Sequence, residues 1–306
     1  MKFDVICFGA LNIDRLYQVN RIAGRDEESF ITDFKEAPGG SAANTAVGLA
    51  RLGLRTGFIG KVSDSHEGKL LLNDFKRQNV DTNGTIISKE GDCGIAMAYV
   101  DAKGDRALYA YPGVNDTLES KEVDLEYARK TEFLHLTSFI GTKPFDAQKE
   151  LVRELNDVRV SLDPGELHAR RGLAALKPLL EKSAVTLPSE NEVRLLTGKN
   201  YVEGSKILIK EGASIVAVKL GERGCYVTDE REKHLLKPYK VKVVDTTGAG
   251  DAFCAGFLYG VIRNRDLYEC GRLGNFVASR CIEKAGAREG LPSHSDLKDI
   301  ELKSAL

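Results

Sequence analysis

Short runs of apolar residues alternate along the chain with longer segments in which apolar residues recur every three or four positions. Runs such as Val5-Ile6-Cys7-Phe8 are typical of strands with both faces covered. Strands are expected over residues 3–9, 55–60, 133–138, 158–163, 184–188 and 214–219. Helices are expected over residues 42–52, 66–79, 144–156, 170–182, 189–197, 250–263 and 266–284. This alternation predicts an α/β fold in which helices cover both faces of a mostly parallel sheet.

Residues 15–38 and 93–111 break the alternation, because each looks like a pair of strands without an intervening helix. In the second segment, residues 101–105 (Asp-Ala-Lys-Gly-Asp) predict a hairpin turn. The two segments are distant in sequence but could pair into one small sheet. The alternative is that they extend the central sheet and its core. No linker, low-complexity segment or internal repeat is evident, so one domain is expected over residues 1–306.

Composition narrows the class of protein. The 44 basic and 45 acidic residues give a formal charge of −1, without the global basic field that nucleic-acid binding usually needs. The six cysteines are scattered without a C-x-x-C pair, which indicates reduced thiols in a cytoplasmic protein. The five histidines form no zinc pattern, and no segment reaches membrane-spanning length. We therefore expect a soluble, unexported protein whose affinity for any anion is local.

The run Asp245-Thr-Thr-Gly-Ala-Gly-Asp251 carries the strongest chemical signal. Apolar residues continue beyond it at 253, 254, 257, 258, 261 and 262, on one face of a helix. The two glycines let the backbone turn tightly, and the first turn of a helix has unpaired N–H donors that suit a phosphate. Asp251 would repel that phosphate unless it takes a proton from an attacking hydroxyl. The simpler alternative is a helix start in which Asp251 favours the helix dipole.

Two other phosphate-binding motifs do not fit. A dinucleotide fingerprint needs a third glycine where Phe253 stands, which disfavours a nicotinamide enzyme. A Walker-type loop needs Ser or Thr after its lysine, but Gly60-Lys61 is followed by Val62.

Residues 245–251 resemble the C-terminal signature of the ribokinase (PfkB) family of carbohydrate and nucleoside kinases, in which D-T-x-G-A-G-D precedes a helix. Residues 39–46 (Gly-Gly-Ser-Ala-Ala-Asn-Thr-Ala), followed by Leu-Ala-Arg-Leu-Gly at 49–53, resemble the second family signature. Matching segments run from Gly9 to Pro292. The resemblance implies a ribokinase-like three-layer α/β/α fold, with residues 15–38 and 93–111 forming a β lid over the substrate. Exposed lid strands are also a place where two subunits of a homodimer can pair.

The same resemblance implies roles for individual residues. It assigns the general base to Asp251, and the amides of Gly248, Ala249 and Gly250 to the transferring phosphate. The substrate-binding positions that it implies are Asn12, Asp14, Gly40, Ser41 and Asn44. The nucleotide-binding positions are Lys219, Gly221, Gly224 and Asn275. Asn12 and Asn44 could instead be turn or cap residues, and Asn275 a surface residue.

The cofactors that the resemblance implies are Mg²⁺ and, in several relatives, a monovalent cation such as K⁺. Glu192 is expected to help place Mg²⁺ through water, since magnesium favours carboxylates and retained waters. The family usually has Asn where this chain has Ser189, and Ser189 with Glu192 also reads as a capping box. Asp245 and Thr247, with the Gly286-Ala287 segment, match the loop that binds the monovalent cation.

The resemblance implies an ATP-dependent kinase that transfers the γ-phosphate to a primary hydroxyl of a nucleoside or a sugar. Ribokinase has lysine where this chain has Ser41, and an acidic residue near Phe139. A Gly-Gly-Ser-x-x-Asn pattern occurs in relatives that phosphorylate nucleosides, and Phe139 or Tyr99 could stack on a base. We therefore favour a nucleoside, although Phe139 could equally be core packing. The alternatives are a ribokinase- or fructokinase-type sugar kinase and an inactive ligand-binding homologue, against which the presence of Asp251 argues.

Overall fold

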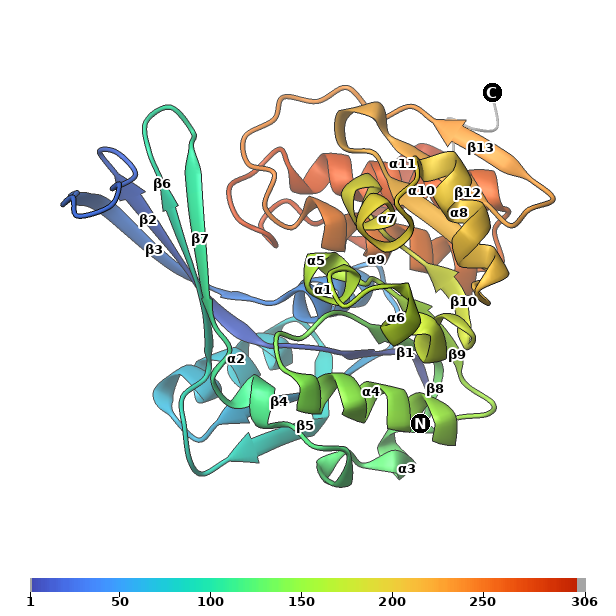
Figure 1. Ribbon diagram of the computed structural model, residues 1–306, viewed down its shortest axis with the longest axis horizontal. Coiled ribbons are helices and arrows are strands. Elements are labelled where there is room, and N and C mark those ends of the chain that lie inside the picture. Colours follow the sequence, from blue (N-terminus) through green and yellow to red (C-terminus); the bar gives the residue numbers. More distant parts are fainter. Residues whose placement is uncertain (1, 302–306) are drawn as a thin grey trace.

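The computed structural model describes residues 2–301, and within them the chain forms two sheets (Figure 1). The larger sheet of these residues has nine strands in the order β13-β12-β11-β10-β9-β8-β1-β4-β5. They are β1 Phe3–Phe8, β4 Thr56–Ser63, β5 Val80–Ser88, β8 Thr131–Leu136, β9 Arg159–Leu162, β10 Ser183–Thr186, β11 Ile215–Lys219, β12 Cys225–Thr228 and β13 Lys233–Leu236. Neighbours from β11 to β5 pair in parallel, and β12 and β13 pair antiparallel at one edge. The predicted, mostly parallel α/β sheet is confirmed.

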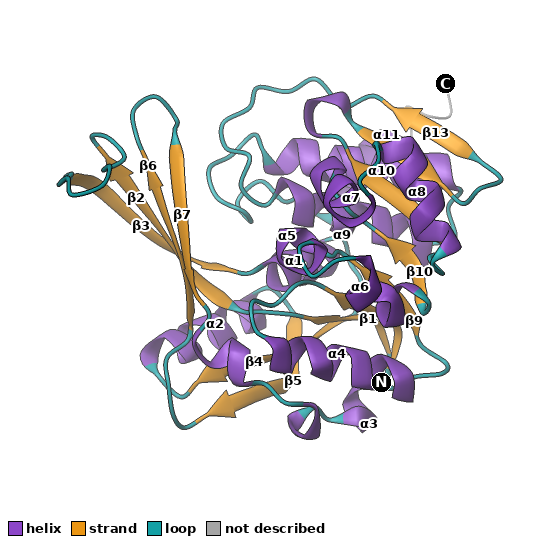
Figure 2. Ribbon diagram, viewed as in Figure 1, coloured by secondary structure: helices purple, strands orange, loops and turns teal. Residues whose placement is uncertain are grey.

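Helices cover both faces of this sheet (Figure 2). One face carries α1 Ser41–Arg51, α2 His66–Arg77, α9 Ala249–Ile262, α10 Leu267–Cys281 and α11 His294–Glu301. The other face carries α3 Leu125–Ala128, α4 Thr142–Glu154, α5 Gly165–Ala169, α6 Leu173–Leu180, α7 Glu190–Thr197 and α8 Tyr201–Lys210. Val5 and Cys7 of β1 pack on the first face, and Ile6 and Phe8 on the second. This alternation explains why β1 is apolar throughout.

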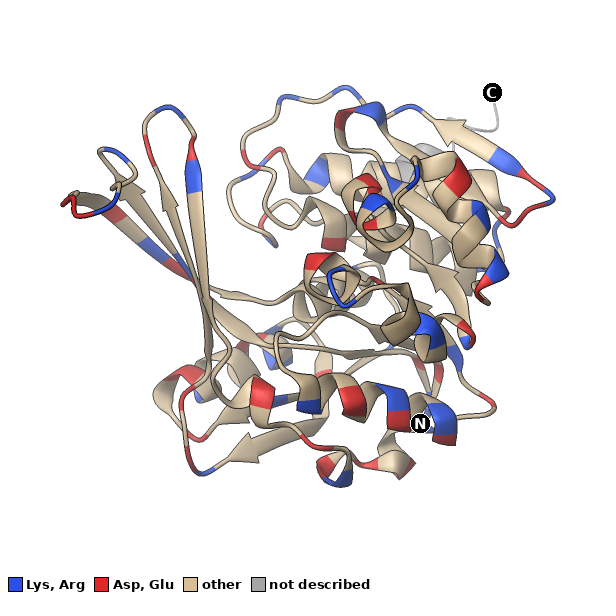
Figure 3. Ribbon diagram, viewed as in Figure 1, with Lys and Arg blue, Asp and Glu red and all other residues tan. Residues whose placement is uncertain are grey.

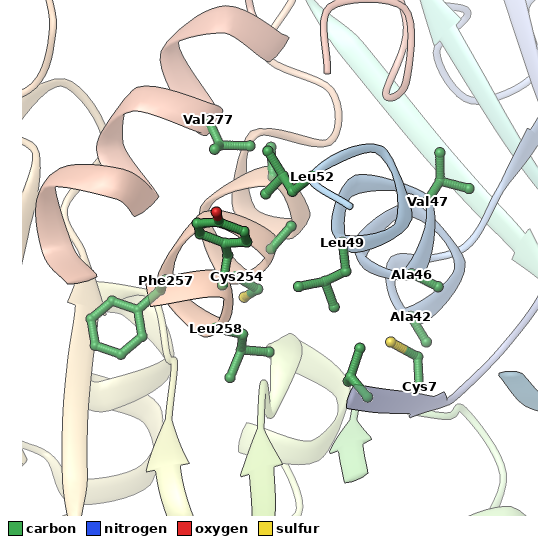
Figure 4. Close-up of a cluster of buried hydrophobic side chains, with 14 of the residues drawn as sticks. Cys7, Ala42, Ala46, Val47, Leu49, Leu52, Cys254, Phe257, Leu258 and Val277 are labelled. Atoms are coloured by element: carbon green, nitrogen blue, oxygen red, sulfur yellow. The ribbon is translucent and has the colours of Figure 1, made fainter. Parts of the chain in front are cut away.

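A close contact between α1 and α9 organises the first face (Figure 4). A Cβ placed on Gly48 of α1 would lie 2.7 Å from the Cβ of Ala255 in α9, so only glycine allows this approach. Leu49 and Leu258 fill the space beside the contact. The contact brings the N-terminal turns of the two helices together, which is where both sequence signatures lie.

Four strands form a separate, smaller sheet that stands away from the large one in Figure 1. They are β2 Asn12–Val19, β3 Ile31–Gly39, β6 Gly94–Val100 and β7 Arg106–Tyr111, in the order β3-β2-β6-β7. The amide of Asp101 donates to the carbonyl oxygen of Asp105 at 3.1 Å, which closes the hairpin between β6 and β7. Strands β2 and β6 pair in parallel and so join the two segments.

The charges and thiols follow the composition. Acidic and basic positions are interspersed on both sides of the large sheet in Figure 3. All six cysteines are free and buried, as predicted. Within residues 2–301, no helix combines the length and the apolar character needed to cross a membrane.

Some elements differ from the predictions. The helix expected over residues 170–182 is the shorter α6, which begins after Gly172 at a φ of +84°, and α5 before it was not predicted. The hairpin of β12 and β13, strand β5 and helix α8 were not predicted, and short 3₁₀ turns occur at η1 Gly113–Thr117, η2 Ser120–Glu122 and η3 Gly221–Arg223. Residues 241–244 form a loop, although three of the four are valines, which favour strands. Its Val243 and Val244 are each 56% exposed, beside the cavity described below.

Candidate active site

The bend before α9 is held by its own side chains. Gly248 is the N-cap, with a φ of +76°, and a Cβ there would lie 2.7 Å from the Cα of Ala287. Asp245 Oδ1 accepts bonds from the amide and hydroxyl of Thr247, and Asp245 Oδ2 accepts from the amide of Gly286. Burial alone would raise the pKa of Asp245, but these bonds hold it below its usual value. The bend is therefore fastened to the 286–287 loop as one unit.

The amides expected to bind phosphate differ in their availability. The Ala249 amide donates to the carbonyl oxygen of Thr246 at 3.2 Å, so in this structure it closes the turn. Gly250 lies in the first turn of α9, facing Lys219, whose Nζ would be 3.7 Å from a Cβ at that position. The positive end of the helix and the lysine thus point to the same place, which is a suitable environment for an anion.

Asp251 stands one residue further along α9 and faces α1. Its Oδ2 accepts a hydrogen bond of 2.9 Å from Asn44 Nδ2, and its carbonyl oxygen accepts from Thr45 Oγ1. Burial raises the pKa of Asp251 to about 7, although the bond from Asn44, the charge of Lys219 and the hydroxyl of Ser41 oppose this rise. A carboxylate with this pKa can accept a proton near neutral pH.

The proposed substrate side is built from β2 and the start of α1. Gly40 caps α1 at a φ of +101°, and a Cβ there would lie 2.4 Å from the carbonyl oxygen of Ala10. The carboxylate of Asp14 lies against Gly39, where a Cβ would be 2.0 Å from it. Burial raises the pKa of Asp14 to about 6, and the charge of Arg288 opposes the rise. Asn44 therefore faces Asp251, while Asp14 and Gly40 lie at the start of the helix that carries Asn44.

The two remaining residues predicted to bind the substrate are Asn12 and Ser41. Asn12 opens β2, and its Oδ1 accepts a 2.9 Å bond from Asn115 Nδ2, so one of its polar atoms is occupied within the protein. Ser41 is the first residue of α1 and is exposed. Its hydroxyl favours the ionised form of Asp251.

Lys219 ends β11 and is paired within the protein. Its Nζ lies 2.6 Å from Oδ2 of Asp163, which follows β9, and that oxygen also accepts a bond from Cys254 Sγ at 3.3 Å. Burial disfavours the charge on Lys219, but the carboxylates of Asp163 and Glu192 outweigh burial and hold its pKa above the usual value. The lysine is therefore a fixed positive charge beside Gly250.

A cavity of about 560 Å³ extends from the first turn of α9 to α10. All four predicted nucleotide-binding residues line it, namely Lys219, Gly221, Gly224 and Asn275. Apolar side chains complete the lining, among them Val241, Val243, Phe253, Ala278 and Ile282. Its size is within the range of sites for small ligands.

Asn275 is buried rather than exposed, contrary to the alternative of a surface residue. Its Nδ2 donates to the carbonyl oxygens of Leu236 and Lys237, at 3.4 and 3.2 Å. Asn275 thus fastens the loop after β13 to α10 at the wall of the cavity.

Glu192 forms the predicted capping box at the start of α7. The Ser189 hydroxyl accepts from the Glu192 amide, and Glu192 Oε2 accepts from the Ser189 amide at 2.7 Å. Burial raises the pKa of Glu192 while the charge of Lys219 opposes the rise. The capping box uses Oε2, so Oε1 is the oxygen that fits a water ligand of Mg²⁺.

Three buried charged residues around the site were missed by the sequence interpretation. Asp163 is paired with Lys219, and Arg288 lies between Asn44 and Asp74. Asp163 could have been predicted from the sequence, because an acidic residue directly after a strand of a parallel sheet lies at the edge where ligands bind. No sequence pattern indicates Asp74 and Arg288, because these two residues meet only through the packing of α2 against the loop after α10.

The stacking of a base predicted for Phe139 is wrong in this structure, and Tyr99 lies on the face of the small sheet opposite Asp14. Phe139 is 1% exposed and packs edge-on against Phe8 in the core. Tyr99 is paired with Tyr17 across the small sheet, and its ring stacks on that of Tyr17 at 4.9 Å. Because side chains alternate along a strand, Tyr17 and Tyr99 point away from the face that carries Asp14.

Comparisons with known proteins identify the family. A model of the pfkB family of carbohydrate kinases matches residues 2–294. A protein of Archaeoglobus fulgidus described as an uncharacterized sugar kinase is 48% identical over 253 residues, which is 82% of this chain and all of that one. The ATP-dependent ribose-1-phosphate kinase of Halopiger xanaduensis is 32% identical over 287 residues, 93% of each chain. The crystal structure of ribokinase from Thermotoga maritima has a TM-score of 0.88 at 23% identity, covering 98% of this chain and 99% of that one. The chain therefore belongs to the pfkB family of carbohydrate kinases, which are phosphotransferases with an alcohol group as acceptor, and it has the ribokinase-like fold.

Proposed function

We propose that this protein transfers the γ-phosphate of ATP to a primary hydroxyl of a sugar or nucleoside, with Asp251 as the general base. The observation that carries the proposal is the position of Asp251. It belongs to the amide-rich first turn of α9, and its carboxylate faces Asn44 at the start of α1. Phosphoryl transfer requires a base beside the attacking hydroxyl and positive groups or hydrogen-bond donors around the transferring phosphate.

The donor side follows from the cavity next to Gly250. We place the adenine against the apolar wall that includes Val241 and Val243, and the phosphates toward Gly250 and Lys219. Bound Mg²⁺ would neutralise the charge on the phosphates, and Glu192 would hold one of its waters. The Lys219 ammonium, fixed by Asp163, would stabilise the transferring phosphate.

We place a sugar ahead of a nucleoside as the acceptor. The two aromatic residues that favoured a nucleoside face the core or the opposite side of the small sheet. The side chains that remain at this end, Asp14 and Asn44, are polar groups suited to the paired hydroxyls of a sugar. The name of the Halopiger relative puts ribose 1-phosphate among the compounds to be tested.

The acceptor is tested by a panel. The enzyme, MgATP and D-ribose, D-fructose, ribose 1-phosphate, 2-keto-3-deoxygluconate, adenosine or cytidine are mixed, and ADP release is measured. Phosphorylation of a sugar with a kcat/KM well above that of either nucleoside supports the proposal. The reverse order establishes the nucleoside kinase. If no compound releases ADP, the alternative of an inactive ligand-binding homologue is favoured.

We also propose that K⁺ activates the enzyme by ordering the bend at Asp245 and Thr247. The bend and the Gly286-Ala287 loop are already joined by Asp245, so a cation there would stiffen both. Repeating the best panel assay with tetramethylammonium chloride in place of KCl should lower kcat. Equal rates in the two salts would show that the hydrogen bonds of Asp245 suffice.

We further propose that the small sheet closes over the acceptor and that two copies pair through its outer face. Tyr17, Phe34, Tyr99 and Tyr109 form a row of rings on this face, with centroids 4.9 to 6.0 Å apart. Phe34 is 50% and Tyr109 is 61% exposed, which is unusual for side chains of this size. An aromatic surface on open strands favours a second copy of the same sheet.

The double variant F34E/Y109E should therefore convert a dimer into a monomer, as measured by light scattering after gel filtration. The carboxylates would have to be buried in the interface, which is costly. Y268E is the matched control, because Tyr268 is also 50% exposed but lies on α10, outside the small sheet. A wild-type protein that is monomeric at all concentrations would contradict the pairing.

A further inference from the structure

A buried arginine stands behind the proposed acceptor site. Arg288 follows α10 and is only 7% exposed. Its Nε donates to Asn44 Oδ1 at 2.8 Å, its Nη1 to Asp74 Oδ2 at 2.6 Å, and its Nη2 to the carbonyl oxygen of Gly39 at 3.4 Å. The guanidinium therefore joins α2 to the signature segment at the start of α1.

The chemistry of these groups determines which way the Asn44 amide points. A guanidinium has only donors, so the atom of Asn44 that faces Arg288 must be its oxygen. The NH₂ group then faces Asp251 and donates to Oδ2 at 2.9 Å. Without Arg288, the carboxylate of Asp251 would be left as the group in this contact that opposes a turn of the carboxamide. After such a turn, the oxygen of the carboxamide would face the carboxylate oxygen of Asp251, which is repulsive.

Asp74 completes the arrangement from the other side. Its Oδ2 accepts from Arg288, while its Oδ1 accepts from Arg77 at 3.2 Å at the protein surface. The side chain of Asp74 is 10% exposed and that of Arg288 is 8% exposed, so the pair is largely shielded from water. An ion pair in such a place holds a specific geometry.

We propose that Arg288 is a positioning residue, which Asp74 holds in place and which orients the Asn44 carboxamide so that its NH₂ group is directed at Asp251. This inference rests on the proposed role of Asp251 as the base. The hydrogen bonds of Arg288 go to Asn44, Asp74 and the carbonyl oxygen of Gly39, so its orienting effect on the site passes through Asn44.

The test measures the protonation of Asp251 directly. Aspartate labelled with ¹³C at Cγ is incorporated, and the carboxyl signals are followed by NMR as the pH changes in the enzyme without substrates. The signal of Asp251 is the one that D251N lacks. The other groups that face Asp251 are Asp163, Lys219, Cys254, Cys281, Ser41 and Arg288. Of these six residues, only Arg288 is replaced in the variants described next.

The informative variant is R288M/D74N, which removes a positive and a negative charge together and leaves no buried ion alone. It should raise the pKa of Asp251 by about one unit, because a hydrogen bond to the ionised form is lost. N44A should have a similar effect, since it removes the donor itself. In the triple variant R288M/D74N/N44A, the pKa should equal that of N44A alone.

Additive effects in the triple variant would overturn the proposal, because Arg288 would then act without Asn44. An unchanged pKa in R288M/D74N would overturn it as well. R77M is the matched control, since Arg77 binds the other oxygen of Asp74 from the surface and should leave the pKa unchanged. The variant D251N tests the role of Asp251 as the base separately from the role of Arg288. If D251N keeps full turnover in the panel assay, the role of the base fails, whereas the NMR result still decides the role of Arg288.

Discussion

Asp251→Asn is expected to lower kcat by about a thousandfold, within the range of about 10² to 10⁴ for the loss of a positioned base. The substitution keeps the size of the side chain and an oxygen that can accept from Asn44 Nδ2. An amide does not take up a proton from the acceptor hydroxyl at neutral pH, so only the chemical step is affected. Turnover is measured as ADP release, and ATP binding by calorimetry should change little.

The matched control is Asp146→Asn on α4, where the carboxylate is 48% exposed and paired with Lys149 at the surface. It should leave kcat unchanged. A D251N enzyme whose kcat stays within tenfold of the wild type would remove Asp251 from the mechanism.

The same variant should gain stability while it loses activity. The pKa of Asp251 is raised from its usual value of 3.8 to about 7 in the folded protein, so ionisation of this group opposes folding. The loss of folding stability caused by this ionisation is absent below pH 3.8, grows as the pH rises and reaches its full value above pH 7. It is at most about 4 kcal/mol at pH 8, since one pKa unit corresponds to about 1.4 kcal/mol. Thermal unfolding of D251N should therefore occur at a higher temperature than that of the wild type at pH 8, and at a similar one at pH 4.

The second large effect is on the pH dependence of the reaction. Asp251 must be ionised to act as a base, so protonation of this group alone should lower kcat/KM for the acceptor about tenfold per pH unit below pH 7, which is about a hundredfold at pH 5. The pKa of Asp14 is about 6 and its carboxylate is expected to accept from the acceptor hydroxyls, so the slope should steepen below pH 6.

The variant D14N separates the two groups. It should remove the steeper part of the profile and keep the limb near pH 7. A wild-type profile that is flat from pH 8 to pH 5 would show that neither carboxylate has to be ionised. Activity and circular dichroism are recorded on the same samples, so that loss of structure is not counted as loss of ionisation.

The features that could be predicted from the sequence are those determined by neighbours in the chain. The covered strand β1, the start of α9 at Ala249 and the capping box of Ser189 each depend on a few consecutive residues. The four nucleotide-side residues and the trio of Asp14, Gly40 and Asn44 came from the family resemblance. In the structure the four line one cavity, Asn44 bonds to Asp251, and Asp14 lies against Gly39, next to Gly40.

The features that could not be predicted depend on which segments meet in space. The loop at Val241 and Val243 has a strand-like composition because it lines a cavity, not because it pairs with a neighbour. Phe139 is an aromatic residue near the expected site, but its partner is Phe8, which no local pattern indicates. Arg288 and Asp74 are separated by most of the chain, so the sequence around either residue does not predict the ion pair.

The close approach of α1 and α9 at Gly48 has a consequence for how this enzyme would lose its activity. Asn44 and Asp251 are carried by two helices that have no room to slide past one another, so their relative placement is settled when the chain folds. Substrate capture would then be left to the small sheet and the loops. On gradual heating, the geometry around Asp251 should therefore persist until the protein unfolds globally, so that inactivation and global unfolding occur at the same temperature.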